Sequence, residues 1–224
     1  MKRYEENFDK ILQRIEKARI EANEYNIVNI IAVSKYSSAD DIKDLYNIGQ
    51  RAFGENKVQD LKLKALDLED LPIQWHFIGR LQKNKINTLL DLSPTLIQSC
   101  DSLELAKEID KRAKIKNISV DILLQVNSAK EESKAGVYPE YAIETYLNIQ
   151  ENCSFVNLKG IMSIGAHTDD KKEIQKSFEK TYYIFEKLKQ NGAKYCSMGM
   201  SSDFETAIKC GSNMLRLGST IFKT

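Results

Sequence analysis

The segment Ile27-Val-Asn-Ile-Ile-Ala-Val-Ser-Lys35 decides how this chain is expected to fold. It is an apolar run of strand length, and its Val and Ile content favours a strand that is buried in a parallel sheet. The run stops on a serine and a single lysine. The sequence therefore predicts a buried strand over residues 26–34, with Lys35 at its last step.

A lysine is an awkward residue for the end of a buried strand, because its ammonium must leave water while its stem packs beside the sheet. Burial disfavours the charged form of a lysine and frees its amine as a nucleophile. Such an amine forms a Schiff base with a carbonyl compound, pyridoxal 5'-phosphate (PLP) above all. The alternative is a lysine that packs its stem on the sheet and extends its amine into water.

Short apolar strands alternate with amphipathic helices along the rest of the chain. Further strands are predicted near 51–53, 74–78, 95–98, 120–126, 155–161, 195–198 and 214–217. Helices are predicted at 4–23, from 37–40 to 47, and near 57–68, 84–90, 103–113, 140–152, 172–190 and 204–209. Strict alternation implies parallel strands with right-handed crossovers, and eight such strands close into a barrel. The predicted fold is an α/β (β/α)8 TIM barrel with an extra N-terminal helix.

An open doubly wound sheet is the second candidate for the fold. It should show a Gly-rich GxGxxG segment after the first strand, but Val33-Ser-Lys-Tyr-Ser-Ser38 contains no glycine. No linker or low-complexity run interrupts the chain. We therefore expect a single domain over residues 1–224.

Composition limits the classes of partner. The chain has 33 Lys+Arg against 32 Asp+Glu and a net charge of +1, which favours neither a nucleic-acid nor an anionic-membrane partner. The first ten residues are too charged for a signal peptide, and no apolar run reaches membrane-spanning length. The four cysteines form no CxxC pair, so no metal site is expected. These features predict a cytoplasmic protein.

Functional residues of such a barrel are expected just past the C-terminal ends of its strands. Two segments in such positions suit a phosphate group, and we call them the phosphate rims. One runs from Gly199 to Asp203 and the other from Gly218 to Thr220. Both offer backbone N–H groups, and loops after the seventh and eighth strands commonly hold phosphate in barrels. Alternatively, Ser201 or Ser202 is only the N-cap of the following helix.

Barrel closure would also place Arg216, on the eighth strand, on a strand that neighbours the one ending at Lys35. An arginine that faces a pyridine nitrogen keeps this nitrogen unprotonated, because a guanidinium does not give up its proton. Such an arginine weakens PLP as an electron sink. A surface salt bridge is the alternative role for Arg216.

Several blocks of the sequence, spread in order over nearly the whole chain, resemble the YggS-type PLP homeostasis proteins. They are Ala32-Val-Ser-Lys35, Phe53-Gly-Glu-Asn56, Trp75-His-Phe-Ile-Gly79, Gln125-Val-Asn127, Lys134-Ala-Gly136, Ser197-Met-Gly-Met-Ser201 and Arg216-Leu-Gly218. The resemblance implies a barrel similar to the N-terminal domain of alanine racemase, with PLP bound to Lys35. It also implies that the phosphate lies at Ser201, Gly218 and Ser219, that Arg216 faces the pyridine nitrogen, and that Asn56, His76 and Met198 line the pocket.

The same resemblance bears on whether the chain is an enzyme. Racemisation needs a base on each face of the substrate, and alanine racemase takes its second base from a C-terminal domain that this sequence does not show. We therefore expect a monomeric protein that binds, shelters and hands over PLP, with apo-PLP enzymes as acceptors and without strong turnover. The alternatives are a small racemase-like PLP enzyme, a Schiff-base lyase that uses Lys35, or a barrel that only scaffolds a partner.

Overall fold

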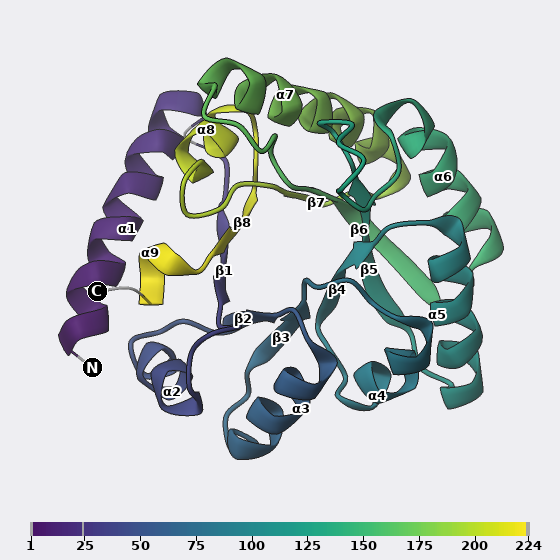
Figure 1. Cartoon of the computed structure of the whole chain (residues 1–224), viewed down its shortest axis with the longest axis horizontal. Helices are drawn as coiled ribbons and strands as arrows, with labels where there is room; N and C mark the ends of the chain where they lie inside the picture. Colours follow the sequence, from purple (N-terminus) through teal and green to yellow (C-terminus); the bar gives the residue numbers. More distant parts are fainter. Residues whose placement is uncertain (1, 24, 223–224) are drawn as a thin grey trace.

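The computed structural model describes residues 2–23 and 25–222. Eight parallel strands form a closed barrel in the order of the sequence, and helices surround it (Figure 1). The predicted TIM barrel with an extra N-terminal helix is confirmed. The strands are β1 (Asn29–Val33), β2 (Ala52–Glu55), β3 (Gln74–Phe77), β4 (Leu96–Cys100), β5 (Val120–Val126), β6 (Val156–Ser163), β7 (Tyr195–Ser197) and β8 (Met214–Leu217).

The helices follow the predicted segments, with differences mainly at their ends. They are α1 (Lys2–Ala22), α2 (Ala39–Asn47), α3 (Val58–Asp67), α4 (Ile86–Asp91), α5 (Leu103–Lys116), α6 (Pro139–Asn152), α7 (Lys171–Leu188), α8 (Phe204–Lys209) and α9 (Ser219–Phe222). Two short 3-10 helices, η1 (Lys83–Lys85) and η2 (Lys189–Asn191), precede α4 and follow α7. Helix α9 was not predicted, because four residues are too few to show a helical period.

The barrel closes between β1 and β8. Ile31 pairs with Arg216 and Ala32 with Leu217 in the parallel register of these two strands. Arg216 is therefore on the strand next to the one that leads into Lys35, as the closed barrel predicted. These two residues come from opposite ends of the sequence, and hydrogen bonding between the first and last strands brings them together.

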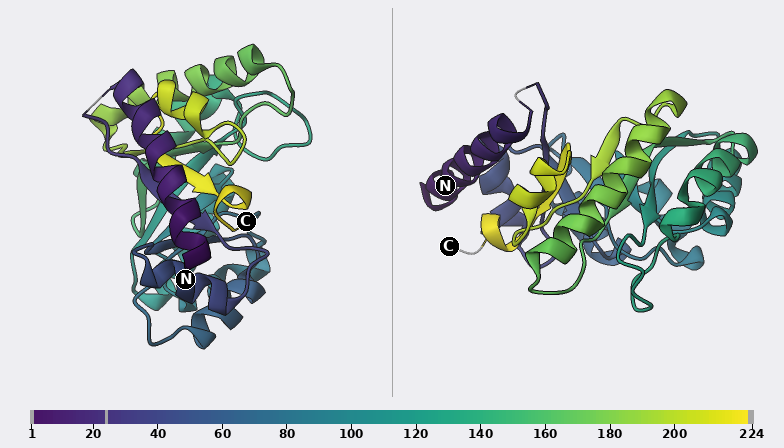
Figure 2. Two further views of the ribbon diagram at one scale, coloured as in Figure 1. Left: turned by 90° about the vertical axis from the view of Figure 1, so that its left-hand side faces the viewer. Right: turned by 90° about the horizontal axis from the view of Figure 1, so that it is seen from above.

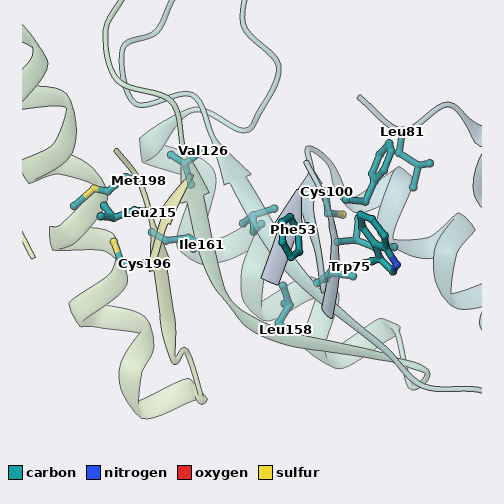
Figure 3. Packing of buried hydrophobic residues seen from close by; sticks show 14 of the residues in the cluster. Phe53, Trp75, Leu81, Cys100, Val126, Leu158, Ile161, Cys196, Met198 and Leu215 are labelled. Atoms are coloured by element: carbon teal, nitrogen blue, oxygen red, sulfur yellow. The ribbon is translucent and has the colours of Figure 1, made fainter. Parts of the chain in front are cut away.

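Apolar side chains pack in two layers. A small cluster inside the barrel joins residues of five strands, namely Ile31, Leu96, Leu123, Met162 and Met214. A larger cluster lies between the strands and the helices, and Figure 3 shows part of it. Alternate residues of each strand enter the two layers, as parallel strands buried on both faces require.

Helix α1 packs on the outside of the barrel next to α8 and α9, so the first and last helices of the chain are neighbours (Figure 2). Its buried residues Tyr4, Phe8, Ile11, Ile15 and Ala18 recur at three- and four-residue steps. Within the described ranges, no helix is both long enough and apolar enough to cross a membrane. The same ranges contain no cluster of three or more His, Cys, Asp or Glu side chains that could hold a metal ion.

Candidate functional site

A cavity of about 860 Å³ opens at the C-terminal ends of β1, β2, β7 and β8. Its volume lies in the range of small-molecule sites. Six of the eight residues predicted from the sequence line it, namely Lys35, Asn56, Ser201, Arg216, Gly218 and Ser219. A larger cavity, of about 1030 Å³, lies among α1, α7 and α8 and contains none of the predicted residues. We take the first cavity as the candidate site because the predicted chemistry converges there.

Lys35 stands at the mouth of this cavity. Strand β1 ends at Val33, so Lys35 lies in the turn that follows and is half-buried. Its Nζ lies 5.0 Å from the ring centroid of Tyr36, which is 91% exposed. Strand β1 thus ends earlier than predicted, and Lys35 is half-buried and not fully buried. The amine is accessible to a molecule in the cavity.

A buried ion pair supports the backbone just before Lys35. The Lys64 ammonium donates to the Ser34 carbonyl oxygen at 2.6 Å and to Glu55 Oε1 at 2.7 Å. The Ser34 hydroxyl also donates to Glu55 Oε1, at 2.7 Å. The Glu55 side chain is fully buried and that of Lys64 is 14% exposed. Sequence reasoning assigned no role to Lys64, although the Phe53-Gly-Glu-Asn56 block already included its partner.

The two predicted phosphate rims meet at Ser201. Its Oγ accepts hydrogen bonds from Gly218 N at 3.3 Å, Thr220 N at 3.2 Å and Thr220 Oγ1 at 2.6 Å. Helix α8 begins at Phe204 with Asp203 as its N-cap, so the alternative reading of Ser201 or Ser202 as that N-cap is wrong. The Ser201 hydroxyl instead joins the loop after β7 to the start of α9.

The outer wall of the site comes from α1 and α2. Tyr4 and Asp41 both line the cavity, and the Tyr4 hydroxyl donates to Asp41 Oδ1 at 2.6 Å. The Tyr4 ring also packs edge-on against Phe222, with 6.2 Å between ring centroids. The extra N-terminal helix is thus part of the site, which sequence reasoning missed because nothing local pairs residue 4 with residues 41 and 222.

Arg216 supplies a buried positive charge to the cavity wall. Its residue is 5% exposed, and its Nη1 donates to Ser197 O at 2.8 Å and to Ser197 Oγ at 2.7 Å. Its Nη2 donates to Ser163 O at 2.8 Å. Burial lowers the pKa of Arg216 to about 10, and the nearby Asp203 opposes this shift, so the guanidinium stays charged at neutral pH. The alternative role in a surface salt bridge is therefore wrong.

His76 and Met198, the other two predicted residues, are not among the residues that line the candidate site. His76 is 4% exposed inside the barrel, where its Nδ1 lies 3.0 Å from Gln98 Nε2. Met198 is fully buried and packs near Leu215 and Cys196 (Figure 3). Side chains of neighbouring residues point to opposite faces of a strand, so Met198 faces the helices while Ser197 faces the interior. In this structure both side chains therefore lie outside the lining of the cavity.

The donors in the cavity suit a small phosphorylated aldehyde that contains a pyridine ring. Lys35 offers an amine for the carbonyl group, and Arg216 offers a cation that only donates hydrogen bonds. Ser219 offers an amide and Ser201 a hydroxyl at a rim where barrels hold phosphate, next to the Gly218 amide that donates to Ser201 Oγ in this structure. The surroundings of Gly218 are not crowded, because a Cβ added there would meet nothing closer than Val33 O at 3.4 Å. These residues fit PLP.

Comparison with known proteins agrees with the fold and the motifs. The family model described as "Alanine racemase, N-terminal domain" matches residues 7–224. The pyridoxal phosphate homeostasis protein of Helicobacter pylori strain J99 is 56% identical over 220 residues, which are 98% of both chains. A protein of Bifidobacterium adolescentis, described as unknown, has a crystal structure that superposes with a TM-score of 0.90. It is 32% identical and covers 98% of this chain and 94% of its own.

PipY of Synechococcus elongatus was solved with PLP bound. It is 32% identical to this chain, superposes with a TM-score of 0.79, and the match covers 93% of this chain and 99% of PipY. The H. pylori relative is named for homeostasis and not for an enzymatic reaction. On this evidence the chain belongs to the pyridoxal phosphate homeostasis proteins, within the family of the alanine racemase N-terminal domain.

Proposed function

We propose that this chain binds PLP in the cavity at the C-terminal mouth of the barrel, as a Schiff base on Lys35, and serves intracellular PLP homeostasis in the cytoplasm. The observation that carries the proposal is the convergence of Lys35, Arg216 and the joined phosphate rims on one cavity. The bound PLP in the relative PipY supports the same reading. PLP supplies a reactive aldehyde, and the protein keeps this group from stray amines.

Different residues of the chain would bind different parts of the cofactor. The amides of Gly218 and Ser219 and the hydroxyls of Ser201 and Ser219 would hold the phosphate. Arg216 would face the ring nitrogen and keep it unprotonated, because a charged guanidinium donates a hydrogen bond to this nitrogen without giving up its proton. Asn56 would contact the ring from the end of β2. We also propose that the functional unit is a monomer.

We further propose that the protein carries PLP to apo-PLP enzymes and does not turn over a substrate. A catalytic pocket closes over its reactants and excludes water. Here Lys35 is half-buried at the mouth, and the neighbouring Tyr36 is 91% exposed. The other tyrosine of the lining, Tyr4, already donates its hydroxyl proton to Asp41. An open mouth suits release better than proton transfer on both faces of a substrate.

Borohydride reduction of the PLP-loaded protein, followed by peptide mass spectrometry, tests the Schiff base. We expect the reduced adduct on Lys35 and its loss in Lys35→Ala, while Lys85→Ala is labelled like the wild type. An adduct on Lys57, Lys85 or Lys134 would refute the assignment.

Mixing the loaded protein with an apo-PLP enzyme tests the carrier role. We expect recovery of the acceptor's activity and no racemase, transaminase or decarboxylase turnover by the loaded protein alone. Rapid racemisation of alanine would support the enzyme alternative, and failure to activate any acceptor would rule out transfer.

A further inference from the structure

Four buried polar side chains form a continuous hydrogen-bonded chain through the barrel. Arg216 Nη1 donates to Ser197 Oγ at 2.7 Å, and Ser197 Oγ donates to Gln98 Oε1 at 2.6 Å. Gln98 Nε2 lies 3.0 Å from His76 Nδ1. All four residues are at most 5% exposed. They come from β8, β7, β4 and β3, so this chain of hydrogen bonds joins strands on different sides of the barrel.

This polar chain runs from one end of the barrel towards the other. Arg216 lines the candidate site at the C-terminal ends of the strands. His76 lines a different cavity, of about 520 Å³, which includes Asn29, Gln74 and Thr95 at the beginnings of strands. Two hydrogen-bonding residues in the barrel interior, Ser197 and Gln98, connect the walls of the two cavities.

The donors and acceptors of these hydrogen bonds follow one order from Arg216 to His76. A guanidinium only donates, so the Ser197 hydroxyl accepts from Arg216 and gives its own proton to Gln98 Oε1. The amide nitrogen of Gln98 then faces His76 and donates to Nδ1. His76 must therefore be neutral, with its proton on Nε2. Burial lowers the pKa of His76 to about 4, which agrees with a neutral ring.

We infer that Gln98 is a positioning residue for Arg216. It holds the Ser197 hydroxyl in the orientation that accepts from the guanidinium, and His76 fixes which way the Gln98 amide faces. A buried polar group that loses its partner is costly, so each member of the chain restrains the next. His76 thus acts on the site from a distance and not by contact. The inference rests on the proposed function only in that Arg216 faces bound PLP.

The histidine tautomer tests the inference without any cofactor. The chain contains two histidines, so ¹⁵N NMR of the ring nitrogens is simple to assign, with His167→Gln identifying the signals of His76. We expect His76 in the neutral form with the proton on Nε2 at pH 7. A proton on Nδ1 would mean that the Gln98 amide faces the other way, and would overturn the inference.

Substitution of Gln98 tests the effect on the site. Gln98→Leu removes the acceptor of Ser197, so we expect a shifted absorption maximum of bound PLP and a Kd raised about tenfold. Gln125→Leu is the matched control, because Gln125 is another buried glutamine, on β5, whose Nε2 donates to Ala135 O at 2.9 Å. It should bind PLP with the wild-type spectrum and a Kd within about twofold.

Gln98→Glu separates positioning from packing. Its carboxylate still accepts from Ser197 and offers His76 an acceptor, so the wild-type absorption of bound PLP should return while His76 becomes protonated at a higher pH than in the wild type. A wild-type spectrum and Kd in Gln98→Leu would refute the positioning role. Should Gln98→Leu not fold, a proton on Nδ1 of His76 in the wild type, or a shifted absorption maximum in Gln98→Glu, would still refute the positioning role. Failure of wild-type protein to bind PLP would refute the proposed function, and the tautomer result would still stand.

Discussion

Asn7, in the second turn of α1, donates from Nδ2 to the carbonyl oxygen of Thr220 at 2.7 Å, although the two residues are 213 positions apart. The same nitrogen donates to Ile221 O at 2.9 Å. The last carbonyl groups of a helix have no partner within the helix, and Asn7 satisfies two of them in α9. Since α9 begins at Ser219, the first helix of the chain holds one wall of the candidate site in place.

Asn7→Leu should therefore speed the release of PLP several-fold and lower the free energy of unfolding by about 1 kcal/mol. Both effects follow from the loss of the donor that ties α9 to α1. Release is measured as transfer of PLP to an apoenzyme in excess, and stability by urea denaturation. Asn152→Leu is the matched control, because Asn152 Nδ2 donates to Asn148 O at 2.8 Å on an exposed face of α6. Equal release rates for the two variants would contradict the prediction.

Ser201 and Ser219 should differ in what their hydroxyls contribute. Ser201→Ala removes the acceptor of three hydrogen bonds, so it should lower the free energy of unfolding by about 1–2 kcal/mol and also speed release. Ser219 is exposed, and its hydroxyl makes no hydrogen bond to the part of the chain that the structure describes. Ser219→Ala should speed release with stability unchanged. Denaturation and PLP transfer, measured on both variants, check this difference between the two serines. A large loss of stability in Ser219→Ala would count against it.

His76 should make the protein less stable as the pH falls. Burial lowers its pKa from 6.5 to about 4, so between these values the unfolded chain binds more protons than the folded one. This contribution is fully present above pH 6.5 and is lost as the pH falls towards about 4, with ~2 kcal/mol lost by pH 5.

Urea denaturation of cofactor-free protein at pH 7 and pH 5 measures this dependence. The loss of stability between the two pH values should be smaller in His76→Gln than in the wild type. His167→Gln, which removes the other histidine, should keep the wild-type loss. An identical loss in all three proteins would show that His76 does not carry the effect.

Lys64 should matter more for stability than a lysine of a surface ion pair. Lys64→Met leaves the fully buried Glu55 without its cation, which should cost about 3–5 kcal/mol. Adding Glu55→Gln to this variant should recover a large part of the loss, because the buried charge is then removed. Lys189→Met breaks an exposed pair with Glu186 and should cost less than about 1 kcal/mol. Chemical denaturation of the four proteins gives the comparison, and similar losses for Lys64→Met and Lys189→Met would contradict it.

Much of the architecture could be predicted because its signals are local. Apolar runs of strand length alternate with amphipathic segments, and this alternation alone indicates parallel strands and a barrel. Parallel strands all end at the same mouth, so residues that follow strands, such as Lys35, Asn56 and Ser201, could be placed together without knowing any contact. The resemblance of the sequence motifs to a known family then predicted PLP as the cofactor that fits this mouth.

The rest depended on register, side-chain direction and contacts between distant segments. Whether Lys35 is buried depends on β1 ending at Val33, and whether Met198 faces the cavity depends on which face of β7 its neighbour Ser197 occupies. The role of His76 appears only when four strands bring its ring, Gln98, Ser197 and Arg216 into one hydrogen-bonded chain. The sequence by itself determined the elements, their order and the mouth at which the chemistry lies, because hydrophobic periodicity acts over a few residues. Only the tertiary structure decided which side chains reach the cavity and which support it from behind, because each hydrogen bond pairs atoms that barrel closure brings together from distant parts of the chain.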